Sequence, residues 1–215
     1  GALYGTSYNR DSQGRIIHDI DADGTPIPQI GPRKILGFGV NPVSLGFGSN
    51  IRYKNLTLNF LIEGKNGGQM FSGTNAMAKY FGAHKATIDA DGRENGFTVS
   101  GVDANGSAFT TTIAPDRIED YWRRTYSIAE EAIYDVNYLR LRQLSLGYGI
   151  PSSMLEDTFI SSARVSLIGR NLFLLSNSVE NVDPESGYNV SNSQGLEWFG
   201  MPVPRSLGLN VNLKF

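Results

Sequence analysis

The sequence predicts an all-β chain built from antiparallel strands. Its apolar residues recur mainly with period two, the spacing at which successive side chains of a strand point to opposite faces of a sheet. Glycine is frequent, with 25 residues among 215. No apolar run approaches the roughly 18 residues that suggest a transmembrane helix. If this chain enters a membrane, strands must therefore carry it there.

The first strands are expected in the N-terminal third of the chain. A weak strand covers residues 1–8, and a clear pair follows at 43–53 and 55–64. In both members of the pair, apolar side chains alternate with small or polar ones. Between the two strands there is room only for a tight turn around Lys54 and Asn55, so we expect a hairpin.

The next strand, 137–150, has an irregular phase. Its apolar residues from Leu144 onward share one face, yet Arg140 and Arg142 fall on that same face if the alternation is unbroken. Either a β-bulge near Gln143 shifts the phase, or the arginine-bearing end rises above the apolar band. The strand directions inferred below favour the second explanation.

Two further strands, 162–174 and 205–215, complete the set of about six. The last one alternates without error, and its apolar face carries Leu207, Leu209, Val211, Leu213 and Phe215. Such a strand has one face for an apolar environment and one for a polar environment.

The connections alternate between short turns and two long polar loops, 65–136 and 175–204. Transmembrane barrels place short turns on the periplasmic side and long loops outside. If Phe215 ends in the periplasm, both long loops fall outside the cell. The sequence therefore predicts a segment of an antiparallel transmembrane β-barrel. Within the first loop we expect a hairpin at 98–112 and a short helix at 115–124.

Composition excludes several classes of function. The formal net charge is −2, without the basic footprint of a nucleic-acid binder, so no nucleic-acid partner is expected. The chain has no cysteine and two histidines, and it lacks H-E-x-x-H and G-x-S-x-G motifs. Adjacent Glu130 and Glu131 could suggest paired-carboxylate hydrolysis, but neighbours on an extended chain point to opposite faces, so a solvated loop is the preferred interpretation. We expect neither enzymatic activity nor a cofactor.

One acidic cluster resembles half of a calcium-binding loop. Asp19, Asp21 and Asp23, followed by Gly24, place carboxylates at alternate positions, as in an EF-hand. The twelfth position is Ile30, so the bidentate glutamate of such a loop is missing. An ordinary Asp/Gly turn is the preferred interpretation, and no metal site is expected.

Several motifs, in order along the chain, are similar to those of one family. Residues 133–151, IYDVNYLRLRQLSLGYGIP, resemble the penultimate hairpin of SusC/RagA-type TonB-dependent receptors. Residues 169–173 match the family's G-[RQ]-N-L-[FY] strand, and the Asp-Pro of 183–184 and the Pro-x-Pro-Arg of 202–205 follow. The chain then ends on an aromatic residue, Phe215.

The resemblance implies an outer-membrane transporter of a Gram-negative, Bacteroidota-type bacterium that imports oligosaccharides or peptides. Family members are large plugged barrels of the 22-strand class, so this chain would be the C-terminal sector of such a barrel. A SusD-like lipoprotein would cap the barrel, and TonB would act through an N-terminal region absent from this sequence. The other contacts would be the remaining strands, the plug and membrane lipid. A start at Gly1 without a signal peptide suggests a fragment or a processed product.

Two groups of residues have expected roles. Aromatic side chains in the long loops could contact substrate or the lid, pack loop against loop, or form the interfacial aromatic girdle. These candidates are Trp122, Tyr126, Trp198 and Phe199. By the resemblance, the last strand carries the signal read by the barrel-assembly machinery, formed by Leu209, Val211, Leu213 and Phe215.

Two alternatives belong to other classes of protein. The chain could be a barrel piece with only a binding or assembly role, which pairs with another polypeptide of a split transporter. It could also be a soluble β-sandwich carbohydrate-binding module, in which the apolar faces would be buried between two sheets. Partition into detergent separates the barrel from the sandwich.

Overall fold

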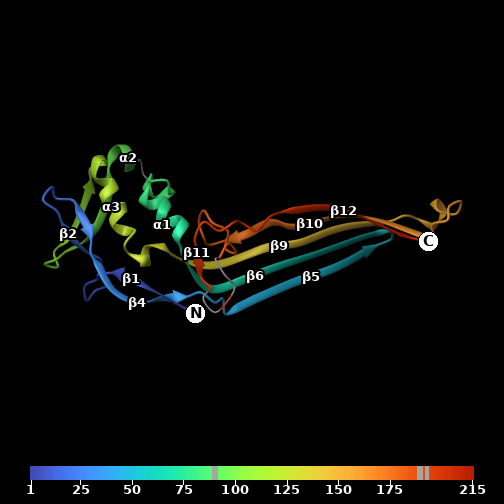
Figure 1. Cartoon of the computed structure of the whole chain (residues 1–215), viewed down its shortest axis with the longest axis horizontal. Helices are drawn as coiled ribbons and strands as arrows, with labels where there is room; N and C mark the ends of the chain where they lie inside the picture. The colour runs from blue at the N-terminus through green and yellow to red at the C-terminus, as the bar shows by residue number, and fades with distance from the viewer. Residues whose placement is uncertain (89–91, 188–190, 192–193) are drawn as a thin grey trace.

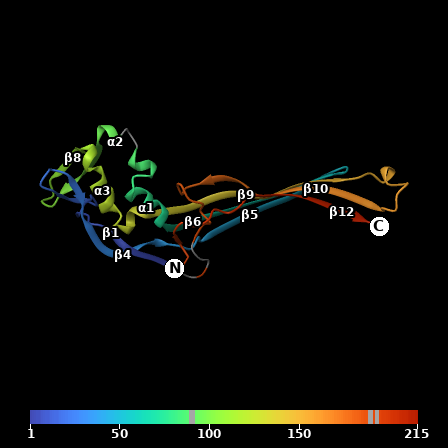
Figure 2. The ribbon, with the colours of Figure 1, turned by 45° about the horizontal axis from the view of Figure 1, so that its top comes forward.

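The computed structural model describes residues 1–88, 92–187, 191 and 194–215. The molecule is elongated, with long strands at one end and a compact group of helices and short strands at the other (Figure 1). Figure 2, turned by 45°, places the helices and the C-terminus at the same opposite ends. Among the described residues, no helix is both long and apolar enough to cross a lipid bilayer.

Five long strands form an antiparallel sheet in which each strand pairs with the next one along the chain. They are β5 (Val43–Tyr53), β6 (Leu56–Ser72), β9 (Ile133–Gly149), β10 (Ser162–Asn177) and β12 (Ser206–Lys214). The two-residue strand β11 (Leu196–Glu197) lies parallel to the end of β6. The predicted antiparallel all-β fold is confirmed, and the sheet is an up-and-down meander.

Within the described part of the chain, the two edge strands of this meander, β5 and β12, each lack a partner on one side. Among the described strands, β5 and β12 each have one long neighbour, so one edge of each strand is left without a ladder. An exposed edge strand is a template for pairing with another strand, and a closed barrel removes both edges. The meander therefore has the form of an open sector of a barrel.

The register places apolar residues of all five strands in continuous rows on one face. One row crosses the sheet through Ile51, Leu58, Leu146, Leu167 and Leu209. The next residues along the strands face the other way, and they are small or polar: Arg52, Thr57, Gly147, Ser166 and Asn210. We call these surfaces the apolar face and the polar face.

The length of β5 suits a crossing of the hydrocarbon layer. Its 11 residues extend about 37 Å at roughly 3.4 Å per residue. At a tilt of about 45°, this length spans about 26 Å, close to the apolar band of outer-membrane barrels. β6, β9 and β10 are longer, and their extra residues lie towards the helical end (Figure 1).

Among the described strands, four were not predicted from the sequence: β2 (Ile17–Ile20), β3 (Pro26–Pro28), β4 (Ile30–Phe38) and the two-residue β11. β4 pairs with β1 (Ala2–Tyr8), and β2 and β3 lie between these two strands in the chain. β4 contains Gly31 and Pro32, and its alternation is poor, so period-two analysis passes over it. The expected loop 65–136 is also too long, because β6 continues to Ser72 and β9 begins at Ile133.

Segments from two loops build a compact unit at the helical end, which we call the loop module. Its sheet has the order β3-β2-β7-β8, with β7 (Phe97–Asp103) and β8 (Ala108–Ile113) forming the predicted hairpin. Its helices are α1 (Gly73–Tyr80), α2 (Gly92–Asn95) and α3 (Ile118–Thr125). Short 3-10 turns are η1 (Lys85–Thr87), η3 (Pro115–Arg117), η4 (Ala129–Ala132) and, outside the module, η5 (Ser152–Met154).

The loop module has its own apolar core, formed by Val99, Ile113, Ile118 and Trp122. The expected helix at 115–124 is present as η3 followed directly by α3. β2 pairs in parallel with β7, so the loop before β4 and the loop after β6 share one sheet. The two loops thus form one structured body.

Candidate functional site

Strand β9 changes phase at a bulge. Leu61 of β6 pairs with Gln143 and Ile62 pairs with Leu141, so Arg142 is an extra residue on β9. The extra residue returns Leu141 to the apolar face and places Arg140 opposite Glu63 on the polar face. The expectation that the arginine-bearing end keeps its phase above the apolar band is therefore wrong. The bulge explanation is correct.

The bulge brings two arginines to a group of carboxylates on the polar face. Arg140 is only 3% exposed, and its Nη2 lies 2.6 Å from Asp183 Oδ1. Arg142 donates from Nε to Glu63 at 2.7 Å and from both terminal nitrogens to Glu185 at 2.7 and 2.9 Å. Planar guanidinium groups suit such two-pronged contacts. We call these residues the arginine cluster.

Asn171 completes the arginine cluster from β10. Its φ of 52° is in the left-handed region, which Asn adopts more readily than most residues. Its Oδ1 accepts from Arg142 Nη1 at 3.0 Å, and its Nδ2 donates to the carbonyl of Pro204 at 3.1 Å. The backbone N–H of Val203 donates to Asp183 at 3.3 Å. The four motifs seen separately in the sequence thus meet at one place.

The arginine cluster holds the connection between β10 and β12 against the sheet. Asp183, Glu185 and Pro204 all belong to residues 178–205, and all three contact side chains of β9 or β10. The predicted loop 175–204 begins after Asn177, and part of it folds back over the polar face near β6 and β9 (Figure 1). Sequence patterns gave no signal for this fold-back, because the contacts join residues about 40 positions apart.

Low pH should weaken the contact between residues 178–205 and the sheet. Burial alone would raise the pKa of Glu185, but hydrogen bonds from Arg142 and Tyr138 outweigh burial and lower it from 4.5. A lowered folded-state pKa means that the stabilisation is present above about pH 4.5 and is lost as the pH falls further. We expect hydrogen exchange in residues 178–187, corrected for intrinsic rates, to rise on going from pH 7 to pH 3.5. In Glu185→Gln the two pH values should give similar protection; an unchanged pH effect would contradict this assignment.

A second feature is an exposed aromatic pair, Trp198 and Phe199, which are 46% and 61% exposed. Trp198 stacks on Phe71 at 6.3 Å between ring centroids and lies against Gly73, where a Cβ would meet the indole at 2.0 Å. Phe199 has a φ of 52°, a costly conformation for a bulky residue. The two side chains are therefore held in fixed, exposed positions.

A buried carboxylate anchors this aromatic pair. Glu197 is 1% exposed and accepts from the hydroxyls of Ser72 at 2.6 Å and Thr74 at 2.5 Å. The Thr74 hydroxyl in turn accepts from the Phe199 backbone N–H at 2.7 Å. These contacts stabilise the left-handed backbone at Phe199 and fix the pair at the beginning of α1.

The other two candidate aromatics have different environments. Trp122 is 6% exposed and packs with Phe97 and Tyr121 in the core of the loop module. Tyr126 is partly exposed and meets the ring of Tyr80 edge-on at 5.2 Å. Of the four, Trp198 and Phe199 are the most accessible, and Trp122 borders a cavity of the loop module.

Adjacent acids Glu130 and Glu131 tie the loop module to β1. Glu131 accepts from Lys79 Nζ at 2.5 Å and from the Tyr8 hydroxyl at 2.6 Å. Glu130 accepts from the Tyr8 backbone N–H and from Arg10. Burial, and then the charge of Glu131, raise the pKa of Tyr8. These acids hold the loop module and β1 together.

The acidic segment before β3 forms an Asp/Gly turn, the interpretation that the sequence favoured. Asp21 accepts from the backbone N–H groups of Asp23 and Thr25 and pairs with Arg117 at 2.6 Å. Asp23 also lies near Arg117, and Asp19 accepts from Gln29. Among the residues that the structure describes, no cluster of His, Cys, Asp or Glu is arranged to hold a metal ion.

The end of the sheet at the C-terminus carries exposed apolar and aromatic side chains. Leu209, Val211 and Leu213 lie on the apolar face of β12, and Phe215 stacks on Phe159 at 5.6 Å between ring centroids. Exposed Tyr53 and Tyr148 lie near the same end, in the row through Leu56. An aromatic belt at the edge of an apolar band is typical of membrane barrels.

A meander with one apolar face, one polar face and a loop folded over the polar face defines a sector of a transmembrane β-barrel. No protein-family model matches the chain. The chain is 28% identical over 215 residues to TonB-dependent receptor P3 of Formosa agariphila, covering 97% of this chain and 20% of that protein. It is 26% identical over 217 residues to TonB-dependent receptor P26 of the same organism, with 96% and 20% covered. The chain thus spans about a fifth of the length of these relatives.

Solved structures share the fold over the whole chain. The RagAB peptide transporter matches with a TM-score of 0.58, and the RagAB peptide importer in its closed-closed and open-open states matches with 0.64 and 0.62. Identity is 17% in each case, and the match covers 100% of this chain and 22–23% of the other. The resemblance to TonB-dependent receptors is confirmed, and the fold is shared with the RagAB peptide transporter.

Proposed function

We propose that this chain is the C-terminal barrel sector of a TonB-dependent transporter in the outer membrane of a Bacteroidota-type bacterium. The observation that carries the proposal is the pair of opposite faces on one meander. The apolar rows suit lipid, and the polar face with its folded loop suits a plugged lumen. We assign transport without catalysis, since Glu130 and Glu131 serve as structural ties.

The proposed cargo is an oligosaccharide or a peptide. Similarity to the fold of the RagAB peptide importer supports the peptide, and exposed aromatic faces suit either cargo. A SusD-like lipoprotein would cover the helical end. TonB would act through a plug that lies outside this chain, and the free edges of β5 and β12 would join the remaining strands. Leu209, Val211, Leu213 and Phe215 would guide barrel assembly.

Among the candidate contact residues, Trp198 and Phe199 best fit a role in binding cargo or lid. They are exposed, adjacent and fixed by Glu197. An aromatic residue that anchors a ligand commonly contributes more than 1 kcal/mol to binding. Trp122 and Tyr126 would then act by shaping the loop module.

Uptake by cells that produce the full transporter tests this function. We expect Trp198→Ala to lower uptake at subsaturating substrate at least fivefold, as a loss of about 1 kcal/mol predicts. Met154→Ala, at an exposed site near the opposite end, is the control and should retain normal uptake. Outer-membrane levels are measured for each variant. Normal uptake by Trp198→Ala would argue against cargo contact, and a wild-type protein found in the soluble fraction would refute the transporter class.

A further inference from the structure

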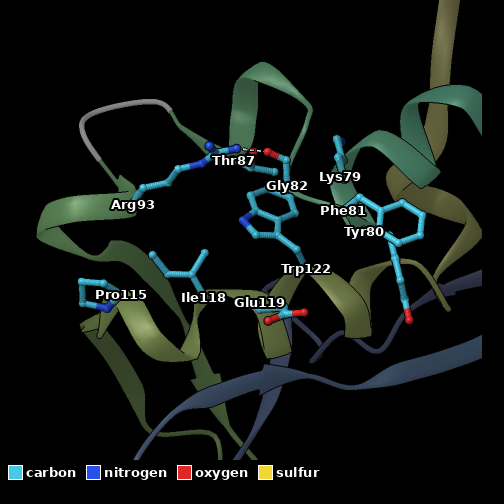
Figure 3. Close-up of a pocket in the computed structure, with 10 residues that line it drawn as sticks. All are labelled: Lys79, Tyr80, Phe81, Gly82, Thr87, Arg93, Pro115, Ile118, Glu119 and Trp122. Atoms are coloured by element: carbon cyan, nitrogen blue, oxygen red, sulfur yellow. Dashed lines mark hydrogen bonds between the residues drawn. The ribbon is translucent and has the colours of Figure 1, made fainter.

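A cavity of about 390 Å³ lies in the loop module between the end of α1 and α3 (Figure 3). Phe81 and Lys79 line it from the α1 side, Ile118 and Trp122 from α3, and Arg93 from α2. The cavity is separate from the arginine cluster and from the Trp198–Phe199 pair. The proposed transport function assigns no role to it.

One wall of this cavity carries an unsatisfied hydrogen-bond donor. Trp122 is 6% exposed, and its indole Nε1 has no hydrogen-bond partner among the residues that the structure describes. Figure 3 places the indole in the middle of the lining residues, with its nitrogen on the side of Arg93 and Ile118. A buried donor without an acceptor costs about 1–3 kcal/mol. A ligand that supplies an acceptor would remove this cost.

The charges around the cavity leave a cation available. Lys79 is paired with Glu131 at 2.5 Å, and Glu119 is paired with Arg123. Arg93 donates to the backbone carbonyl of Gly82, and within the described part of the chain it forms no ion pair with a carboxylate. Figure 3 shows its side chain reaching across towards Gly82. A neutral carbonyl is a weaker partner for a guanidinium than a carboxylate.

Apolar groups form the rest of the walls. The ring of Phe81 is 70% exposed, and Pro115 and Ile118 lie on the opposite side of the cavity (Figure 3). A flat or branched apolar body would bury surface against these groups. The lining thus combines apolar walls with two donors, one of which carries a positive charge.

We propose that this cavity binds a small carboxylate with an apolar body. The carboxylate pairs with Arg93, which leaves the Gly82 carbonyl, and one of its oxygens accepts from Trp122 Nε1. The apolar body packs between Phe81 and Ile118. Because the indole nitrogen is covered before binding, the exposed Arg93 side chain is the group that moves. The site does not depend on transport, since its lining belongs to the loop module alone.

Calorimetric titration of the full detergent-solubilised protein tests the site with two matched probes. 3-Phenylpropionate carries the carboxylate, and 3-phenylpropanamide has the same body without the charge. We expect the carboxylate to bind and the amide to bind at least tenfold more weakly. Arg93→Gln should weaken carboxylate binding at least tenfold. Lys85→Gln removes an exposed cation of η1 outside the cavity and should change binding less than twofold.

Two further variants separate binding from folding. Phe81→Ala removes an exposed ring and should weaken binding at least threefold with unchanged thermal unfolding. Trp122→Phe removes the donor and should weaken carboxylate binding about fivefold. Absence of carboxylate binding, equal affinity for the two probes, or an Arg93→Gln variant that binds normally would each overturn the proposal. None of these results would bear on transport.

Discussion

Replacing Arg140 by methionine is expected to lower the free energy of unfolding by about 3–5 kcal/mol, the usual cost of breaking a buried ion pair from one side. Arg140 is almost fully buried beside Asp183, which is itself only 10% exposed. Methionine fills similar space but leaves this carboxylate without its cation. Denaturant unfolding in detergent measures the stability, and chymotrypsin cleavage after Trp198 or Phe199 reports release of the loop.

Two comparisons isolate the ion pair as the cause. Arg164→Met removes an exposed arginine from β10 and should change stability by less than about 0.5 kcal/mol. Combining Arg140→Met with Asp183→Leu removes both charges, and this double variant should recover much of the loss. If Arg140→Met is as stable as Arg164→Met, the cluster does not hold the loop as described.

Replacing Leu167 by arginine is the second change with a large expected effect. Leu167 lies on the apolar face in the row that crosses all five strands, and it is 61% exposed in this chain. In a membrane that exposed surface faces hydrocarbon, where an arginine near the midplane costs about 2–4 kcal/mol. We expect this loss when the full barrel is unfolded from lipid vesicles.

The neighbouring residue provides the control. Ser166→Arg places the same side chain on the polar face of the same strand, towards the space near Arg164 and Asn210. It should cost less than about 1 kcal/mol in the same vesicles. Equal losses for the two variants would mean that the faces do not differ in environment, and the lipid assignment of the apolar face would fail.

Alternation in the sequence was sufficient to find the long strands. β5 and β12 follow period two closely, since each has one face for an apolar environment and one for a polar environment. β4 escaped detection because its residues lie beside β1 near the loop module, where no continuous apolar face sets the pattern. Residues 65–72 escaped for a similar reason. They extend a strand beyond the apolar band, where Lys65, Asn66, the two glycines and Gln69 interrupt the alternation before Met70 and Phe71.

The bulge shows a different limit of sequence patterns. A bulge on β9 and the competing explanation are compatible with the same sequence, and the inferred strand directions favoured the wrong one. The structure decides through partners, because Arg142 reaches Glu63 on the polar face and Glu185 in a distant loop. The motifs around Asn171, Asp183 and Pro204 were visible in the sequence. Their convergence was not, because it depends on contacts between segments and on a left-handed residue.

The four candidate aromatic residues also show what sequence patterns can and cannot predict. Position in a polar loop made all four candidates for contact with substrate or lid, and Tyr126, Trp198 and Phe199 are exposed. Trp122 is buried because the loop folds into a module with its own core, which alternation cannot reveal. The same burial creates the unsatisfied indole nitrogen that marks the cavity.

The central claim is that the meander separates lipid from a polar lumen, and labelling along β12 tests it most directly. This chain has no cysteine, so single cysteines can be placed from Ser206 to Leu213, in a full transporter whose other cysteines, if present, are replaced by serine. In intact outer membranes, a water-soluble maleimide should label positions 206, 208, 210 and 212 and spare 207, 209, 211 and 213. Equal labelling of the two sets, or the opposite alternation, would contradict the account.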